Sequence, residues 1–239
     1  MVWCQIKMVS TLGYLDGLTA TGIILSSVIF GLLSFYHARK LGARLLGVAG
    51  VMMIFIGLFW LGPFVDFLLI IFTGKNISPI YVYGWLSYIW VAPAILIAMY
   101  LGSELLLPEK KKIILAIYAI LGTIFELLIF LDVPGSFTFT LNNPGQDTID
   151  SSFNRGSPAY FLIIFFLISV LIFMGIGFAV KAKQATGEIR KKFTYLSIGF
   201  IVFVVCGAID SILPLGVAIG VSRAVMMSFA LFMYLGLKT

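Results

Sequence analysis

The sequence predicts an all-α membrane protein, a bundle of seven transmembrane helices that forms a single domain over residues 1–239. Three observations lead to this prediction. Charged residues make up only 11% of the chain, whereas a typical soluble domain carries about 25%. Hydrophobic residues make up 61%, and the mean hydropathy is +1.12. The apolar segments are continuous rather than alternating, which excludes a barrel of membrane strands, and their aromatic content excludes a disordered chain.

A helical span needs about 20 mostly apolar residues. By this measure the spans cover residues 15–36, 42–72, 79–102, 112–132, 158–181, 192–214 and 217–237. The second is too long for one straight crossing, so Pro63 is expected to kink it, or to end it before a short interfacial helix over 64–72. Pro93, in the middle of the third span, permits a further bend. A tight turn at 213–216 divides the sixth and seventh spans.

Basic residues in the short connections decide the orientation, because Lys and Arg favour the cytoplasmic side. The connections after the first, third and fifth spans hold eleven: Arg39, Lys40, Arg44, Lys110, Lys111, Lys112, Lys181, Lys183, Arg190, Lys191 and Lys192. The opposite connections hold two, Lys75 and Arg155. We therefore expect a multi-pass protein of the cell membrane with its N-terminus outside and its C-terminus inside. Inner basic residues also meet anionic lipid, so the net charge of +6 requires no nucleic-acid partner.

The longest outer connection, residues 133–157, is predicted to form a β-hairpin over the outer mouth of the bundle. An alternating segment, Phe137–Leu141, is followed by the turn-forming run Asn142-Asn143-Pro144-Gly145 and by a second segment from Gln146 to Phe153. The sequence leaves open whether this hairpin is a lid over a pocket or a passive surface element.

The chain lacks the residues that metal sites, cofactor sites and hydrolase active sites need. The chain has one His, His37, and two Cys, too few for a structural zinc site, a haem or an iron–sulfur cluster. It contains no Walker, GxSxG or HExxH motif. A covalently bound retinal would need a lysine in the middle of the last span, but the only lysine there is Lys238, at its inner end. We expect no enzymatic activity, no catalytic residues, no metal and no cofactor.

Ionisable residues within a membrane are costly and often mark function. Counted at about 1.5 Å per residue, Glu126 lies about 21 Å above Lys112, and Asp210 lies about 27 Å above Lys192. Arg223 enters the seventh span from outside and flanks the same turn as Asp210, so these two could form an ion pair. Six charged groups gather in this outer third: Asp16, Asp66, Glu126, Asp132, Asp210 and Arg223. They indicate either a polar cavity that binds a ligand or interfacial charges that pair with each other and with water.

Aromatic residues crowd the same side. The outer half of the third span contains Tyr81, Tyr83, Trp85, Tyr88 and Trp90, and Trp60 lies near the outer end of the second span. An interfacial belt explains most of them, but Tyr88 and Trp90 lie deeper than a belt requires and could line the floor of a cavity. The candidate ligand-binding residues are therefore Glu126, Asp210, Arg223, Asp66, Trp90 and Tyr88.

Two stretches resemble a known family of membrane sensors. Trp85-Leu86-Ser87-Tyr88, followed by Pro93 and an apolar run to Leu101-Gly102, is similar to the third helix of the seven-helix sensory domains that precede histidine kinases and related output modules in archaea and bacteria. Gly187-Glu188-Ile189-Arg190-Lys191-Lys192, leading into Leu196-Ser197-Ile198-Gly199-Phe200, is similar to the entry into their sixth helix. The resemblance covers most of the chain and implies a signal-sensing membrane domain.

No kinase, cyclase or coiled-coil segment follows the seventh span before Thr239. We therefore expect the output to come from a partner, or from a part of the protein outside this chain, and no catalytic residues carry over from the family. The functional expectation is a receptor or sensor module that binds an extracellular small molecule or lipid and contacts a cytoplasmic signalling partner through Lys181 to Lys192. The same basic segment is also explained by orientation alone. A small-solute transporter or channel is the alternative function.

Overall fold

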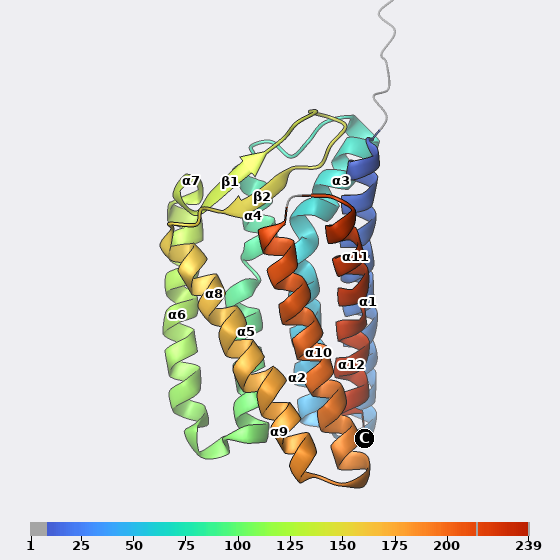
Figure 1. Cartoon of the computed structure of the whole chain (residues 1–239), viewed down its shortest axis with the longest axis vertical. Coiled ribbons are helices and arrows are strands. Elements are labelled where there is room, and N and C mark those ends of the chain that lie inside the picture. The colour runs from blue at the N-terminus through green and yellow to red at the C-terminus, as the bar shows by residue number, and fades with distance from the viewer. Residues whose placement is uncertain (1–8, 214, 239) are drawn as a thin grey trace, which may run out of the picture.

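The computed structural model describes residues 9–213 and 215–238, and it confirms the predicted fold class (Figure 1). Seven helical segments in this part of the chain are long and apolar enough to cross a membrane: Thr11–Leu41, Arg44–Thr73, Tyr81–Leu106, Pro108–Leu131, Pro158–Gln184, Gly187–Ile212 and Val217–Leu237. Each packs against the next along the chain, and the seventh packs against the first, so the spans close into a ring.

The first span, α1 (Thr11–Leu41), is longer at both ends than the apolar run that predicted it. At its start, the side chain of Ser10 accepts a hydrogen bond from the backbone N–H of Gly13, 2.9 Å away, which is a typical N-cap. At its end, Gly42 adopts a left-handed conformation with φ 66°, which suits glycine because it has no Cβ. A side-chain cap at Ser10 and a left-handed glycine at Gly42, rather than hydropathy, set these two boundaries.

The second span is interrupted where Pro63 disturbs it. It consists of α2 (Arg44–Gly57), the tight 3₁₀ turn η1 (Leu58–Trp60) and α3 (Leu61–Thr73). Proline lacks an N–H and crowds the carbonyl four residues earlier, here that of Phe59, so the distortion precedes Pro63. The helix continues past the proline through Thr73, so there is no separate interfacial helix at 64–72.

The third span bends in the same way. It divides into α4 (Tyr81–Tyr88) and α5 (Val91–Leu106), with a break at Ile89 and Trp90. Ile89 stands four residues before Pro93, so the expected effect of the mid-span proline is seen one turn above it. The fourth span follows as η2 (Pro108–Lys110) and α6 (Lys111–Leu131).

The fifth span contains a change of helix type that the sequence did not predict. Between α8 (Pro158–Val170) and α9 (Gly177–Gln184) lies one π-helical segment, η3 (Leu171–Ile176). The side chain of Ser197 in α10 (Gly187–Ile212) donates a hydrogen bond of 2.7 Å to the carbonyl of Gly175 within it. The last span is α11 (Val217–Met226) and α12 (Ser228–Leu237); Pro214, in the turn before it, lies outside the described residues.

The predicted hairpin is present. After the short helix α7 (Val133–Ser136), strand β1 (Phe137–Thr140) pairs antiparallel with β2 (Asp150–Phe153), so that Phe137 faces Phe153 and Thr140 faces Asp150. The second strand begins later than Gln146, because residues 141–149 form a longer connection than a tight turn. Figure 1 shows the hairpin lying across one end of the bundle, with the C-terminus at the other.

We call these the hairpin end and the basic end, since the connections at the latter carry the eleven Lys and Arg residues. The middle of the bundle and its basic half are filled by large side chains that are each at most 1% exposed: Met52, Met53, Met99, Met174, Phe178, Phe200 and Met233. Helices also approach closely: a Cβ added to Gly50 in α2 would lie 2.7 Å from the carbonyl oxygen of Gly31 in α1.

Candidate ligand-binding site

A polar cavity lies beneath the hairpin. Its volume is about 100 Å³, enough for about three water molecules at roughly 30 Å³ each. Drug-sized ligands need about 300–1,000 Å³, so this cavity suits a molecule of only a few heavy atoms. Its polar lining comes from α1, α4, β2, α10 and α11: Asp16, Tyr83, Ser87, Tyr88, Asp150, Ser151, Ser152, Asp210, Ser211 and Arg223.

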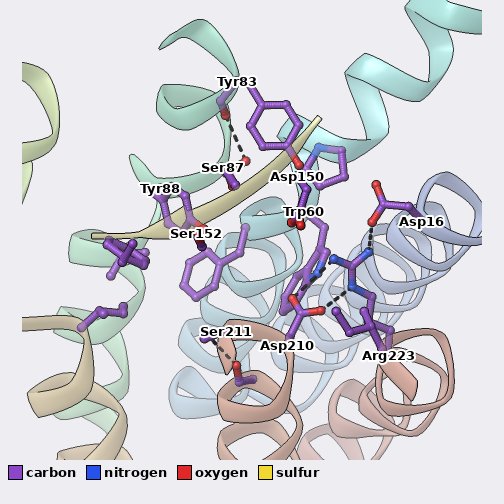
Figure 2. A pocket seen from close by; sticks show the side chains of 18 of the residues that line it. Asp16, Trp60, Tyr83, Ser87, Tyr88, Asp150, Ser152, Asp210, Ser211 and Arg223 are labelled. Carbon is purple, nitrogen blue, oxygen red and sulfur yellow. Dashed lines mark hydrogen bonds and ion pairs between the residues drawn. The ribbon is translucent and has the colours of Figure 1, made fainter. Parts of the chain in front are cut away.

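A buried ion-pair network forms one wall of the cavity (Figure 2). The guanidinium of Arg223 meets Asp210 side-on, with Nε 2.7 Å from Oδ1 and Nη2 3.5 Å from Oδ2. Its Nη1 donates to Oδ1 of Asp16 from the first helix. Arg223 is only 7% exposed and Asp16 only 2%. The expected Asp210–Arg223 pair is thus confirmed, and Asp16 joins it as a third member.

This network carries an excess of negative charge, because two carboxylates share one guanidinium. The second oxygen of Asp16, Oδ2, is buried and has no hydrogen-bonding partner among the described residues. Figure 2 shows it on the side of the carboxylate that faces away from Arg223. Buried polar atoms are normally hydrogen-bonded, so the cavity wall presents an unused acceptor.

The hairpin supplies the opposite wall. All four residues of β2 line the cavity, among them Asp150 and Ser152. Burial raises the pKa of the Asp150 carboxyl above its ordinary value, and the negative charge of Asp16 adds to this effect while Arg223 opposes it. The cavity therefore favours a less negative state of this carboxyl.

The two proline-induced breaks place aromatic side chains at the cavity. Trp60 lies in η1 at the break of the second span, and Tyr88 ends α4 just before the break of the third; both line the cavity. Tyr88 also stacks on Phe137, with ring centroids 4.7 Å apart and an interplanar angle of 17°, and meets the edge of Phe153 at 4.7 Å. Tyr88 therefore packs the hairpin against the helices.

The cavity opens between the hairpin and the end of α10. Ser152 of β2 and Ser211 of α10 are both exposed and both line it. Deeper residues such as Asp16 and Arg223 are almost completely buried. A small molecule entering at this mouth would first pass hydroxyl groups and then reach the ion-pair network.

Asp66 does not line the cavity; it fastens the loops that roof it. Its carboxylate is 0% exposed and accepts hydrogen bonds from the backbone N–H of Ile77 at 2.7 Å, from that of Ile149 at 2.9 Å and from the Asn76 side chain at 2.9 Å. Asn76 in turn accepts from the backbone N–H of Gly145 at 2.7 Å. The sequence placed Asp66 at the outer surface, but it lies inside a junction of α3 with two loops.

Glu126 and Trp90 also lie outside the cavity lining. Glu126 is on α6 beside the backbone of Ala92. Both of its carboxylate oxygens are buried, and neither forms a hydrogen bond of normal geometry among the described residues. Trp90 donates its indole N–H to the carbonyl of Leu86 at 2.9 Å and stacks on Phe55. Of the six residues expected to bind a ligand, the structure thus brings Asp210, Arg223 and Tyr88 together around one cavity.

The unpartnered Glu126 leads to a stability prediction. Glu126→Met should raise the free energy of unfolding by about 1–3 kcal/mol, the usual cost of a buried polar group without a partner. Equilibrium unfolding in mixed micelles of a mild detergent and dodecyl sulfate would measure this. Glu104→Met is the matched control, because Glu104 has a partner, Lys111, at 2.7 Å, and should give no gain. A loss of stability in Glu126→Met would show that its carboxyl has a favourable partner.

Sequence reasoning missed Asp150, Ser151, Ser152 and Ser211 as site residues, and it named Asp16, Tyr83 and Ser87 without assigning them to the site. Asp150, Ser151 and Ser152 belong to the predicted hairpin, but its role as a lid or as a passive element was open, and Asp150 was not counted among the outer charges. The available signal was that Asp150 is an acidic residue in a strand expected to cover the mouth of the bundle. Among the described residues, no group of three or more His, Cys, Asp or Glu side chains is arranged to hold a metal ion.

No protein-family model, curated protein or solved structure matches this chain. The resemblance to seven-helix sensory domains therefore stays a prediction. Function has to be inferred from the residues of the site and from their geometry.

Proposed function

We propose that this chain is a membrane receptor or sensor module, with the hairpin end outside the cell, that binds an extracellular small molecule in the polar cavity and couples to a partner at the basic end. The observation that carries the proposal is the cavity itself, in which an unsatisfied, buried ion-pair network lies beneath an ordered hairpin. Pockets of this kind, with convergent polar groups in an otherwise apolar setting, are typical of ligand sites.

The floor of the cavity favours sensing over transport. Below it lies a second void of about 40 Å³ that shares Phe59 and Phe203 with the polar cavity and is lined only by apolar side chains, including Ala98 and Phe200. The tightly packed Met and Phe side chains lie beyond. A transporter would be expected to continue polar groups through the midplane.

A continuous helix connects the cavity to the basic end. Asp210 is near one end of α10, and Lys191 and Lys192 are near the other, with no break between them. A ligand that changes the contacts of Asp210 would favour one position of α10 over another, and the basic segment from Lys181 to Lys192 would move with it. This segment is our proposed contact for a cytoplasmic partner.

Thiol labelling tests the orientation. In a chain without native thiols (Cys4→Ser, Cys206→Ala), Asn142→Cys in the hairpin connection should react with a membrane-impermeant maleimide in intact cells. Lys183→Cys at the basic end should react only after the membrane is opened. The reverse pattern would place the hairpin inside the cell, where it could not bind an extracellular molecule.

The same background separates sensing from transport. Ser152→Cys at the cavity mouth should react with an impermeant methanethiosulfonate from the hairpin side only. Ala98→Cys, in the wall of the apolar void, should react from neither side of a sealed vesicle. Reaction of Ala98→Cys from the basic side would reveal a path through the bundle and would favour the transporter alternative.

A further inference from the structure

We propose that the cavity binds a small organic cation with a primary ammonium group, held between the carboxylates of Asp16 and Asp150. This inference rests on the proposed function and names the class of ligand. Charge balance, an unused hydrogen-bond acceptor and the shape of the cavity support it independently.

The first argument is the charge of the buried network. Arg223 contributes one positive charge, and Asp16 and Asp210 contribute two negative ones, so the set lacks one positive charge. An uncompensated charge away from water is costly, and it is relieved by a counter-charge or by proton uptake. A monovalent cation in the cavity would balance this set of three residues and would offset part of the charge that Asp150 adds when it is ionised. An anion would add to the excess, and Arg223 already holds both carboxylates.

The second argument is the unpartnered oxygen. Oδ2 of Asp16 belongs to a side chain that is 2% exposed, and it has no donor among the described residues. An ammonium group has three N–H donors and no acceptor, so it can serve this oxygen and still bond to the carboxyl of Asp150 across the cavity. Such charge-assisted hydrogen bonds are among the strongest in proteins. The pKa of Asp150, raised by burial and then by the charge of Asp16, reflects the same excess of negative charge.

The third argument is the shape and lining of the space. Trp60, Tyr83 and Tyr88 line the same cavity as the carboxylates (Figure 2), and aromatic rings attract organic cations. The small apolar void adjoins the polar cavity, and apolar side chains such as Phe59 and Phe203 line both. The space therefore suits an ammonium head with a short hydrocarbon tail, and we take n-butylammonium as the probe.

The experiment measures binding of n-butylammonium chloride to the full chain in lipid nanodiscs by thermal shift and by equilibrium titration. Uncharged n-butanol and anionic butyrate are the matched ligands of similar size. We expect saturable binding of n-butylammonium alone. Asp16→Asn and Asp150→Asn should each weaken it by about 10- to 100-fold, as expected for loss of a hydrogen bond to a charged group. Asp132→Asn should bind as the wild type does, because Asp132 caps α7 outside the cavity.

A steric variant keeps the test decisive if Asp16→Asn does not fold. Gly207 of α10 lines the cavity, and a Cβ added there would meet no atom within 4 Å. Gly207→Leu has room for its Cβ, and its side chain should occupy the space and abolish binding. Val205→Leu, on an exposed face of the same helix, should leave binding intact.

Failure of this inference and failure of the proposed function give different results. Absence of saturable n-butylammonium binding at millimolar concentration, or equal binding by Asp150→Asn, would overturn the ligand class. Binding of butyrate or butanol that Gly207→Leu abolishes would also overturn it, but would leave a small-molecule receptor. Protein-dependent passage of n-butylammonium into proteoliposomes would keep the ligand class and overturn the sensing function.

Discussion

Arg223→Gln is expected to lower the free energy of unfolding by about 3–5 kcal/mol, the usual cost of removing one partner from a buried ion pair. The effect should be large because the substitution leaves both Asp16 and Asp210 without their counter-charge at a site where Arg223 itself is only 7% exposed. Equilibrium unfolding in mixed micelles measures it directly. Arg223→Lys should also lose stability, since a lysine cannot reproduce the side-on contact with Asp210.

The triple variant Asp16→Asn, Asp210→Asn, Arg223→Gln is the control. It removes the whole set of charges, so that no buried carboxylate is left without its counter-charge. It should therefore be more stable than Arg223→Gln alone. An unchanged free energy of unfolding in Arg223→Gln would contradict a buried ion-pair network around Arg223.

The second large effect is expected from Asp66→Asn. An asparagine keeps the shape of the side chain but replaces one acceptor oxygen with an N–H₂ group that faces donors. Each backbone N–H left without an acceptor should cost about 1–3 kcal/mol. At least one of the amides of Ile77 and Ile149, which donate to different oxygens of Asp66, should lose protection against hydrogen exchange, and the loops that Asp66 joins should exchange faster.

Asp132→Asn is again the matched control, because asparagine can still cap a short helix. Its amide exchange at Ile77 and Ile149 should equal that of the wild type. Unchanged protection of these two amides in Asp66→Asn would contradict the role of Asp66 as the junction between α3 and the two loops that roof the cavity.

The fold was largely predictable, because apolar runs determine which segments cross a membrane. The breaks near Pro63 and Pro93 were also predictable, since a proline removes a helical hydrogen bond wherever it stands. The ends of α1 were not, because they depend on the cap at Ser10 and the left-handed Gly42 rather than on hydropathy. The π-helical turn at Leu171–Ile176 left no signal in composition either.

The site was only half predictable. Counting residues gives the height of a side chain along a helix, and this correctly placed Asp210 and Arg223 at one level. It does not say which way a side chain points around the helix, and Glu126, at a suitable height, lies outside the cavity. Asp16 was recognised as an outer charge, but its contact with Arg223 depends on the first and seventh spans meeting in a closed ring. Asp150 depends on a loop that Asp66 and Asn76 hold in place.

The most direct test of the account is a high-resolution cryo-electron microscopy map of the protein purified in native lipid. We expect non-protein density in the cavity, in contact with Asp16 and Asp150, and tightly packed apolar side chains between the cavity and the basic end. A cavity filled by the protein's own side chains would remove the binding site. A water-filled path from Asp210 to the basic end would contradict the sensing function and indicate a transporter or channel.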